Sequence, residues 1–231
     1  MASNIYSFYK QIHPPTAVEH CLYCNFYNFS EQNLVIAGAT VLRIYRLTPE
    51  AEIPAIGEPK LKLECVQVFP LFGNVMSMQS VRLAGSSRDA LLLSFKEAKL
   101  SLVEYDPSTH DLKTLSLHYF EEEDMKAGAN HHPFIPVVRA DPDGRCAAMV
   151  VYERNIVILP FRKDNISEEQ EIASGNAHIA SAVKTPVLAS YTIKLSDIDE
   201  KVNNIKDLQF LQGYYEPTLL LLYEPLRTWP G

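Results

Sequence analysis

One pattern recurs along the chain and restricts the folds that are open to it: an apolar run, a polar break of a few residues, and a second apolar run. The pattern starts at Asn33, Ala90, Cys146 and Thr218. Runs rich in Leu, Ile, Val, Tyr and Phe are typical of strands, and a short break between two of them predicts a β-hairpin. The expected turns are Gly38-Ala39, Lys96-Glu97, Glu153-Arg154 and Glu224-Pro225.

Further strand candidates lie between these hairpins, at residues 63–70, 76–83, 112–119, 187–195 and 205–211. About four strands in each repeat of roughly 50 to 70 residues is typical of β-propeller blades. The repeats carry no Gly-His and Trp-Asp pairs and are longer than WD repeats. The sequence therefore predicts an all-β fold of four-stranded antiparallel blades.

Three polar segments carry the additional length of the repeats. They cover residues 49–60, 121–133 and 164–185, and two of them contain acidic runs. Segments of this composition are expected on the surface, so we interpret them as loops on the rim of the propeller and not as domain linkers.

The number of predicted blades is too small to close a ring. A blade buries its faces against its neighbours and needs closure or a cap. The last hairpin stops at Trp229-Pro230-Gly231, where its second strand should begin. We therefore expect residues 1–231 to be one domain of about three to four blades, the first part of a longer protein. Expressed alone, the chain should aggregate or pack loosely.

The charge balance bears on nucleic-acid binding. The chain has 28 acidic and 21 basic residues, with a formal net charge of −7. Proteins that hold nucleic acid usually present a basic face to the phosphates, and none is visible here. No apolar run approaches the ~20 residues of a membrane span, and residues 1–16 do not resemble a secretory signal. We expect a reducing intracellular environment and free thiols.

The cysteines and histidines do not follow a metal-binding pattern. Cys21 and Cys24 form a CxxC, but zinc requires four ligands and a second pair is missing. Cys65 and Cys146 stand alone, and no matching spacing is found for the histidines His13 and His20. His131 and His132 are adjacent, so in a strand they would point to opposite faces. We predict no metal site.

Two acidic segments are candidates for catalytic or cation sites. The run Glu121 to Asp124 lacks the alternating ligands of a calcium loop and is interpreted as solvated charge. Asp141-Pro-Asp-Gly144 has Pro and Gly where a tight turn requires them, so it is interpreted as a turn between strands. No nucleophile elbow, phosphate loop or HExxH motif is present. We therefore predict no enzyme activity, no cofactor and no catalytic residues.

Several longer segments resemble one family. Residues 9–16, 72–78, 89–121, 141–149 and 214–219 are similar to the N-terminal region of the large-subunit family of the cleavage and polyadenylation specificity factor. The resemblance runs from about residue 6 to residue 231. It is weaker at residues 48–60, 125–136 and 165–186. Long segments such as residues 89–121 are far more specific than short motifs.

The resemblance implies a fold and a role. Members of the family have three β-propellers and a helical C-terminal domain. This chain would form the opening blades of the first propeller, a seven-bladed ring that later strands complete. The family acts in the nucleus, in pre-mRNA 3′-end cleavage and polyadenylation. It is a non-catalytic scaffold, often described as RNA-binding, that holds the WD-repeat and zinc-finger subunits that read AAUAAA and works with the endonuclease module and poly(A) polymerase.

No partner-binding residue can be transferred from the family to a position of this sequence. Exposed aromatics are the usual anchors of protein interfaces, which makes Tyr214, Tyr215 and Trp229 candidates, although aromatics in propellers also pack between blades. Two alternatives remain open. One is a propeller that binds RNA directly through a basic face assembled in three dimensions. The other is a propeller that acts as a ubiquitin-ligase adaptor.

Overall fold

The computed structural model describes residues 10, 16–50, 60–126, 134–152, 154–163, 185–202 and 204–224. Several predictions concern residues outside these ranges. They are the histidines His13, His131 and His132, the turn residues Glu153 and Pro225, the aromatic Trp229, and most of the three long loops.

The described strands form three four-stranded sheets and one hairpin, and all neighbouring strands are antiparallel. Blade 1 contains β1 (His20–Cys24), β2 (Asn33–Gly38), β3 (Val41–Pro49) and β4 (Leu61–Pro70). Blade 2 contains β5 (Val75–Arg82), β6 (Asp89–Phe95), β7 (Lys99–Asp106) and β8 (Asp111–Tyr119). Blade 3 contains β9 (Val138–Ala140), β10 (Cys146–Val151), β11 (Asn155–Pro160) and β12 (Tyr191–Lys194). The fourth unit is the hairpin β13 (Ile205–Leu211) and β14 (Thr218–Tyr223).

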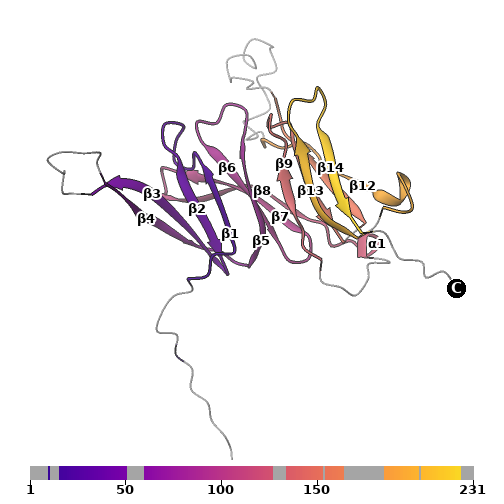
Figure 1. The fold of residues 1–231 in the computed structure, drawn as a ribbon, viewed down its shortest axis with the longest axis horizontal. Coiled ribbons are helices and arrows are strands. Elements are labelled where there is room, and N and C mark those ends of the chain that lie inside the picture. The colour runs from indigo at the N-terminus through magenta and orange to yellow at the C-terminus, as the bar shows by residue number, and fades with distance from the viewer. Residues whose placement is uncertain are drawn as a thin grey trace, which may run out of the picture.

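The blades follow one another in chain order, as the colours of Figure 1 show from indigo to yellow. Their first strands lie side by side, β1 beside β5, β5 beside β9 and β9 beside β13. Within each complete blade the chain then moves outward strand by strand. This is the arrangement of blades around a propeller axis, and it confirms the predicted all-β class of four-stranded antiparallel blades.

Hydrophobic patterning explains which strands lie in the interior. Strands β10 and β11 are almost continuously apolar, and β6 and β7 have buried residues on both faces. Strands covered on both sides are expected to read this way. In the outer strands β4 and β8, apolar residues are interspersed with polar ones, and both strands are largely exposed. The hydrophobic effect therefore places the middle of each blade in the core and its outer strand at the surface.

Three apolar clusters join consecutive blades. The cluster between blades 1 and 2 contains Phe26, Ile44 and Leu91, and all three side chains are fully buried. A second cluster lies between blades 2 and 3 and includes Leu102 and Met149. The third joins blade 3 to the β13–β14 hairpin. Each blade is therefore held mainly by its neighbours, as expected for a repeat architecture.

Polar contacts also connect the first strands. His20 Nε2 lies 3.1 Å from the carbonyl oxygen of Val75. The backbone N–H of Val138 donates to Ser77 Oγ at 3.2 Å, so β9 is joined to β5. Arg139 pairs with Asp207 at 2.9 Å and joins β9 to β13. These contacts fix the order and the height of the first strands along the axis.

The structure corrects several predicted boundaries. Residues 187–195 do not form one strand: Val187 makes an isolated bridge to Phe161, β12 covers only four residues, and a short 3-10 helix (Leu195–Asp197) follows. The loop predicted at 121–133 begins with a one-turn helix, α1 (Glu123–Lys126). Strands β1 and β9 were not predicted, because β1 has five residues and β9 only three, so neither forms a long apolar run.

Most predicted turns are close to the observed ones. The turn between β6 and β7 lies at Lys96 to Ala98, as expected, and the β2–β3 turn lies one residue later than predicted, at Ala39-Thr40. Asp141 to Gly144 is a tight turn, as predicted, closed by the Gly144 N–H donating to the Asp141 carbonyl at 2.9 Å. Among the described residues no helix is long and apolar enough to cross a membrane.

Gly144 illustrates why this turn needs glycine. Its φ is +64°, and a Cβ at this position would lie 2.8 Å from the Arg82 carbonyl oxygen of blade 2. We expect Gly144→Ala to destabilise the fold by about 2 kcal/mol, because strain and a backbone clash add. Gly213 is a matched control: its φ is +85°, but no atom lies within 4 Å of the point that a Cβ would occupy. Gly213→Ala should cost about 1 kcal/mol.

Hydrogen exchange of the β9 and β10 amides in the two alanine variants measures this difference. Equal losses of protection for Gly144→Ala and Gly213→Ala would contradict the close approach between blades 2 and 3.

Candidate protein-interaction surface

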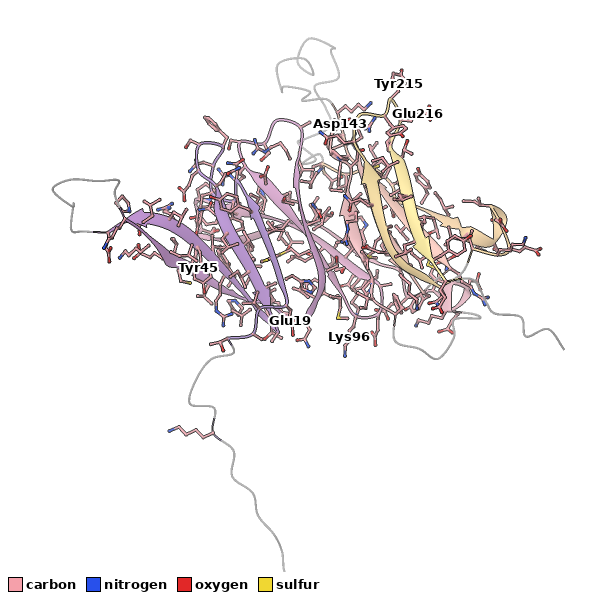
Figure 2. The ribbon with its side chains drawn as sticks, viewed as in Figure 1. Glu19, Tyr45, Lys96, Asp143, Tyr215 and Glu216 are labelled. Carbon is pink, nitrogen blue, oxygen red and sulfur yellow. The ribbon has the colours of Figure 1, made fainter. Side chains whose placement is uncertain are left out.

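The connections β1–β2, β5–β6, β9–β10 and β13–β14 all lie at one end of the sheets, which is called the upper rim here. Figure 2 shows Asp143, Tyr215 and Glu216 at this rim, and Glu19 and Lys96 at the opposite one.

Ion pairs organise the upper rim. Arg82 Nε donates to Asp89 Oδ1 at 2.5 Å, and Asp89 Oδ2 accepts the Asn25 backbone N–H at 2.8 Å. This pair closes the β5–β6 connection and ties it to blade 1.

The corresponding pair in blade 3 is Asp141 and Arg145. Arg145 Nε and Nη2 donate to the two Asp141 carboxylate oxygens at 2.7 and 2.8 Å, and the Asp141 side chain is fully buried. These hydrogen bonds hold the pKa of the Asp141 carboxyl below its usual value. The acidic turn that the sequence suggested is therefore a neutralised structural element.

Arg145 also reaches the next unit. Its Nη1 donates to the Tyr215 carbonyl at 2.7 Å and to the Tyr214 carbonyl at 3.3 Å. One guanidinium therefore joins blade 3 to the end of the β13–β14 hairpin. No motif in the sequence identified Arg145 as a structural residue; the spacing Asp-x-x-x-Arg across a Pro-Asp-Gly turn was the available signal.

The two predicted aromatic anchors Tyr214 and Tyr215 are exposed to solvent, unlike the aromatic residues of the core. Tyr215 is 97% exposed and Tyr214 is 53% exposed, so neither is packed between blades. Both lie between β13 and β14 at the upper rim. The third candidate, Trp229, lies outside the described residues.

A groove of about 800 Å³ lies on blade 2 beside the β4–β5 connection, toward the lower rim. Its lining includes the apolar side chains Leu93, Phe95 and Leu112. Phe72 lines it as well and is fully exposed. The lining also carries charges of both signs, and the groove has no dominant charge.

The acidic run at Glu121 is placed on the lower side of blade 2. Glu121 pairs with Lys99 at 3.2 Å, and the next three residues are exposed to solvent. Glu123 and Asp124 form the first turn of α1, where negative charge is favourable. The run therefore has structural and solvating roles in this part of the molecule.

The cysteines are distributed over different faces. Cys21 and Cys24 are three residues apart on β1, so one is exposed and the other is buried in the cluster between blades 1 and 2. Cys65 is exposed on β4 and Cys146 is buried on β10. In the described part of the chain, no three His, Cys, Asp or Glu side chains gather in a way that could hold a metal ion.

These observations describe consecutive blades that are joined by several of their polar groups. Residues 17–227 match the family described as the RSE1/DDB1/CPSF1 first beta-propeller. The chain belongs to this family. Membership of the first-propeller family accounts for the four-stranded sheets and for their order along the chain. It also confirms the resemblance that was noted in the sequence.

Relatives of the first-propeller family cover nearly the whole chain. This chain is 52% identical to "Cleavage and polyadenylation specificity factor subunit 1" of Drosophila melanogaster, over 98% of this chain and 16% of that protein. It is 36% identical to the probable subunit 1 of Caenorhabditis elegans, over 98% of this chain and 15% of the relative. For Aspergillus fumigatus "Protein cft1" the identity is 30%, over 95% of this chain and 18% of the relative. The chain therefore spans less than one fifth of each of these relatives.

Proposed function

We propose that this chain contributes the opening blades of a non-catalytic scaffold in nuclear pre-mRNA 3′-end cleavage and polyadenylation. The observation that carries the proposal is the 52% identity, across 98% of the chain, to a protein named as a subunit of the cleavage and polyadenylation specificity factor. In this proposal the scaffold holds the WD-repeat and zinc-finger subunits that recognise AAUAAA. Endonuclease and poly(A) polymerase activities belong to other proteins.

The geometry is consistent with a scaffold. The blades are joined by buried apolar clusters, by the ion pair between Arg139 and Asp207, and by the hydrogen bonds that Arg145 donates to the β13–β14 hairpin. A surface of this kind keeps its loops in fixed positions, and fixed loops are suited to holding several partners at once. The arginines Arg82, Arg139 and Arg145 are each paired with a carboxylate. We therefore assign RNA contact to the partners and not to these blades.

The proposal includes a ring that is completed by further strands. The face of blade 1 that points away from blade 2 has no described neighbour and contains Leu34, Ile36, Tyr45 and Val68, which alternate with the core residues of their strands. A sheet face that carries several apolar side chains is expected to be covered in the intact protein. We propose that a closing blade covers it.

Thiol labelling tests this closure. Cys21 pairs with Ile36 across β1 and β2, and Cys65 pairs with Tyr45 across β3 and β4, so both thiols lie on the open face. In the 231-residue chain we expect iodoacetamide to label these two. Burial raises the pKa of Cys24 to about 12 and that of Cys146 to about 11. Because the thiolate is the reactive form, both buried cysteines should remain unlabelled at about pH 8.

In the longest protein that contains this sequence, a closing blade should protect Cys21 and Cys65 as well. Mass spectrometry of the labelled peptides measures all four sites. Equal labelling of Cys21 and Cys65 in the short and the long protein would contradict a closing blade on this face.

A pull-down from nuclear extract tests the scaffold function. The baits are the 231-residue chain and the longest protein that contains it, and the bound proteins are identified by mass spectrometry. We expect only the long protein to capture the WD-repeat and zinc-finger subunits of the polyadenylation-signal complex. Failure of the long protein to capture them would refute the scaffold proposal, and capture of cullin instead would support a ubiquitin-ligase adaptor.

A further inference from the structure

The end of the β13–β14 hairpin presents two aromatic rings to solvent. Tyr214 and Tyr215 are followed by Glu216, and Figure 2 shows Tyr215 and Glu216 at the upper rim next to Asp143 of blade 3. No ring contact between either tyrosine and another described aromatic is found, whereas Phe26, Tyr27 and Tyr105 of the core are packed together. The two exposed rings therefore contribute little to the packing of the described blades.

The backbone under these rings is nevertheless fixed. Arg145 donates to both tyrosine carbonyls, and the buried Asp141 holds the guanidinium in place. The Thr218 hydroxyl donates to the Glu216 carbonyl at 3.0 Å. A rigid backbone with free aromatic side chains is pre-organised for binding, since little backbone entropy is lost when a partner docks. Tyrosine is also among the residues that dominate interface energetics.

The charge next to the rings is negative. The Asp143 side chain is 59% exposed, and its one described partner is Arg145 at 3.3 Å. No described cation pairs with Glu216. Arg145 itself is only 16% exposed and is already bound by Asp141 and the two carbonyls, so it offers little positive charge to a ligand. Phosphates are therefore disfavoured here, and a cation is favoured.

Aromatic rings beside carboxylates suit one side chain in particular. A guanidinium can stack on a tyrosine ring and at the same time donate paired hydrogen bonds to a carboxylate, whereas an ammonium cannot stack in this way. We propose that Tyr214, Tyr215, Asp143 and Glu216 form a docking point for a partner-protein segment that presents an arginine. This inference rests on the proposed scaffold function only in assuming that the propeller binds other proteins.

The test begins with photo-crosslinking in the longest protein that contains this sequence. The crosslinker p-benzoylphenylalanine replaces Tyr215 in cells, and the attached peptide is identified by mass spectrometry. A second protein carries the crosslinker at Tyr191, an exposed tyrosine on blade 3, as the control. We expect a partner-protein segment with an arginine to be attached at position 215 and not at position 191.

The affinity of that segment then identifies the chemistry. A synthetic peptide of the segment should bind the purified long protein about tenfold more weakly after Tyr215→Ala, and about tenfold more weakly when its own arginine is changed to glutamine. Tyr215→Phe keeps the ring and should remain within about twofold of the unchanged protein. Asp143→Asn combined with Glu216→Gln should weaken binding about fivefold. Tyr191→Ala should have no effect.

Several results would overturn the docking point: attachment to RNA, attachment to a later segment of the same chain, attachment to a segment without arginine, or no attachment. A peptide that binds equally well to the Tyr215→Ala protein would do the same. The pull-down of the WD-repeat and zinc-finger subunits separates this failure from failure of the scaffold function. If those subunits are captured and position 215 crosslinks to nothing, only the docking point is wrong.

Discussion

Replacing Phe26 with alanine is expected to lower the free energy of unfolding around blades 1 and 2 by about 3–5 kcal/mol, the usual cost of truncating a buried phenylalanine. Phe26 is fully buried in the cluster between these blades. The centroid of its ring lies 5.1 Å from the ring centroid of Tyr27, 6.1 Å from that of Phe69 and 5.7 Å from that of Tyr105. Alanine would leave a cavity that strands on two sides cannot fill. The same change at Phe72, which is fully exposed, should alter the free energy by less than about 0.5 kcal/mol.

Hydrogen exchange in the longest protein that contains this sequence measures both phenylalanine variants. The amides of β2 and β6 should lose protection in Phe26→Ala and keep it in Phe72→Ala. If the β2 and β6 amides keep the same protection in both variants, the apolar cluster does not hold blades 1 and 2 together. The comparison also matters for function, since a loosened blade 1 would disturb any surface that depends on its position.

Replacing Arg145 with methionine is expected to lower the unfolding temperature of the propeller by about 5–10 °C. The change leaves the buried Asp141 carboxylate without its cation and releases the β13–β14 hairpin from blade 3. The double variant Asp141→Asn with Arg145→Met should recover at least half of this loss, because no unpaired charge remains buried. Lys206→Met is the control, since the Lys206–Glu224 pair is exposed on both sides and should matter little.

The effect of the Arg145 substitution should depend on pH in a defined direction. Arg145 keeps the pKa of Asp141 below its usual value, so the pair stabilises the fold above the ordinary carboxyl pKa of about 4. This contribution is lost as the pH falls through the lowered pKa. The difference in unfolding temperature between the original protein and Arg145→Met should therefore be largest at about pH 7 and shrink below about pH 4. A constant difference would show that Asp141 is not the group left unpaired.

The strands that were predicted correctly are those whose burial is evident from the apolar residues of the strand itself. Strand β10 is continuously apolar and β6 contains the apolar run 90–93, because both faces of these strands are covered, and the sequence shows these runs directly. Strands β1 and β9 were missed because their pairing comes from neighbours: β9 has only three residues and is held by β10 and by Ser77 of β5. The order of blades followed from the repeats, whereas the contacts that join the blades did not.

The candidate surface was predicted only in part. Tyr214 and Tyr215 were identified as aromatics of the kind that anchor interfaces, but their exposure could not be read from their immediate neighbours in the sequence. Their backbone is contacted by Arg145, which lies about seventy residues earlier and donates hydrogen bonds to their carbonyls from another blade. A contact between residues this far apart leaves no periodic pattern. Asp141 shows the same limit, because its short motif identified the turn and did not reveal the buried ion pair.

The two ion pairs of the upper rim have opposite polarity. In blade 2 the arginine ends the first strand and the aspartate begins the second, whereas in blade 3 the aspartate follows the first strand and the arginine precedes the second. Either order joins the two strands, so natural selection can preserve the charge pair while exchanging its members. The similarity between these two blades therefore lies in the paired charge across the turn and not in the residue at each position.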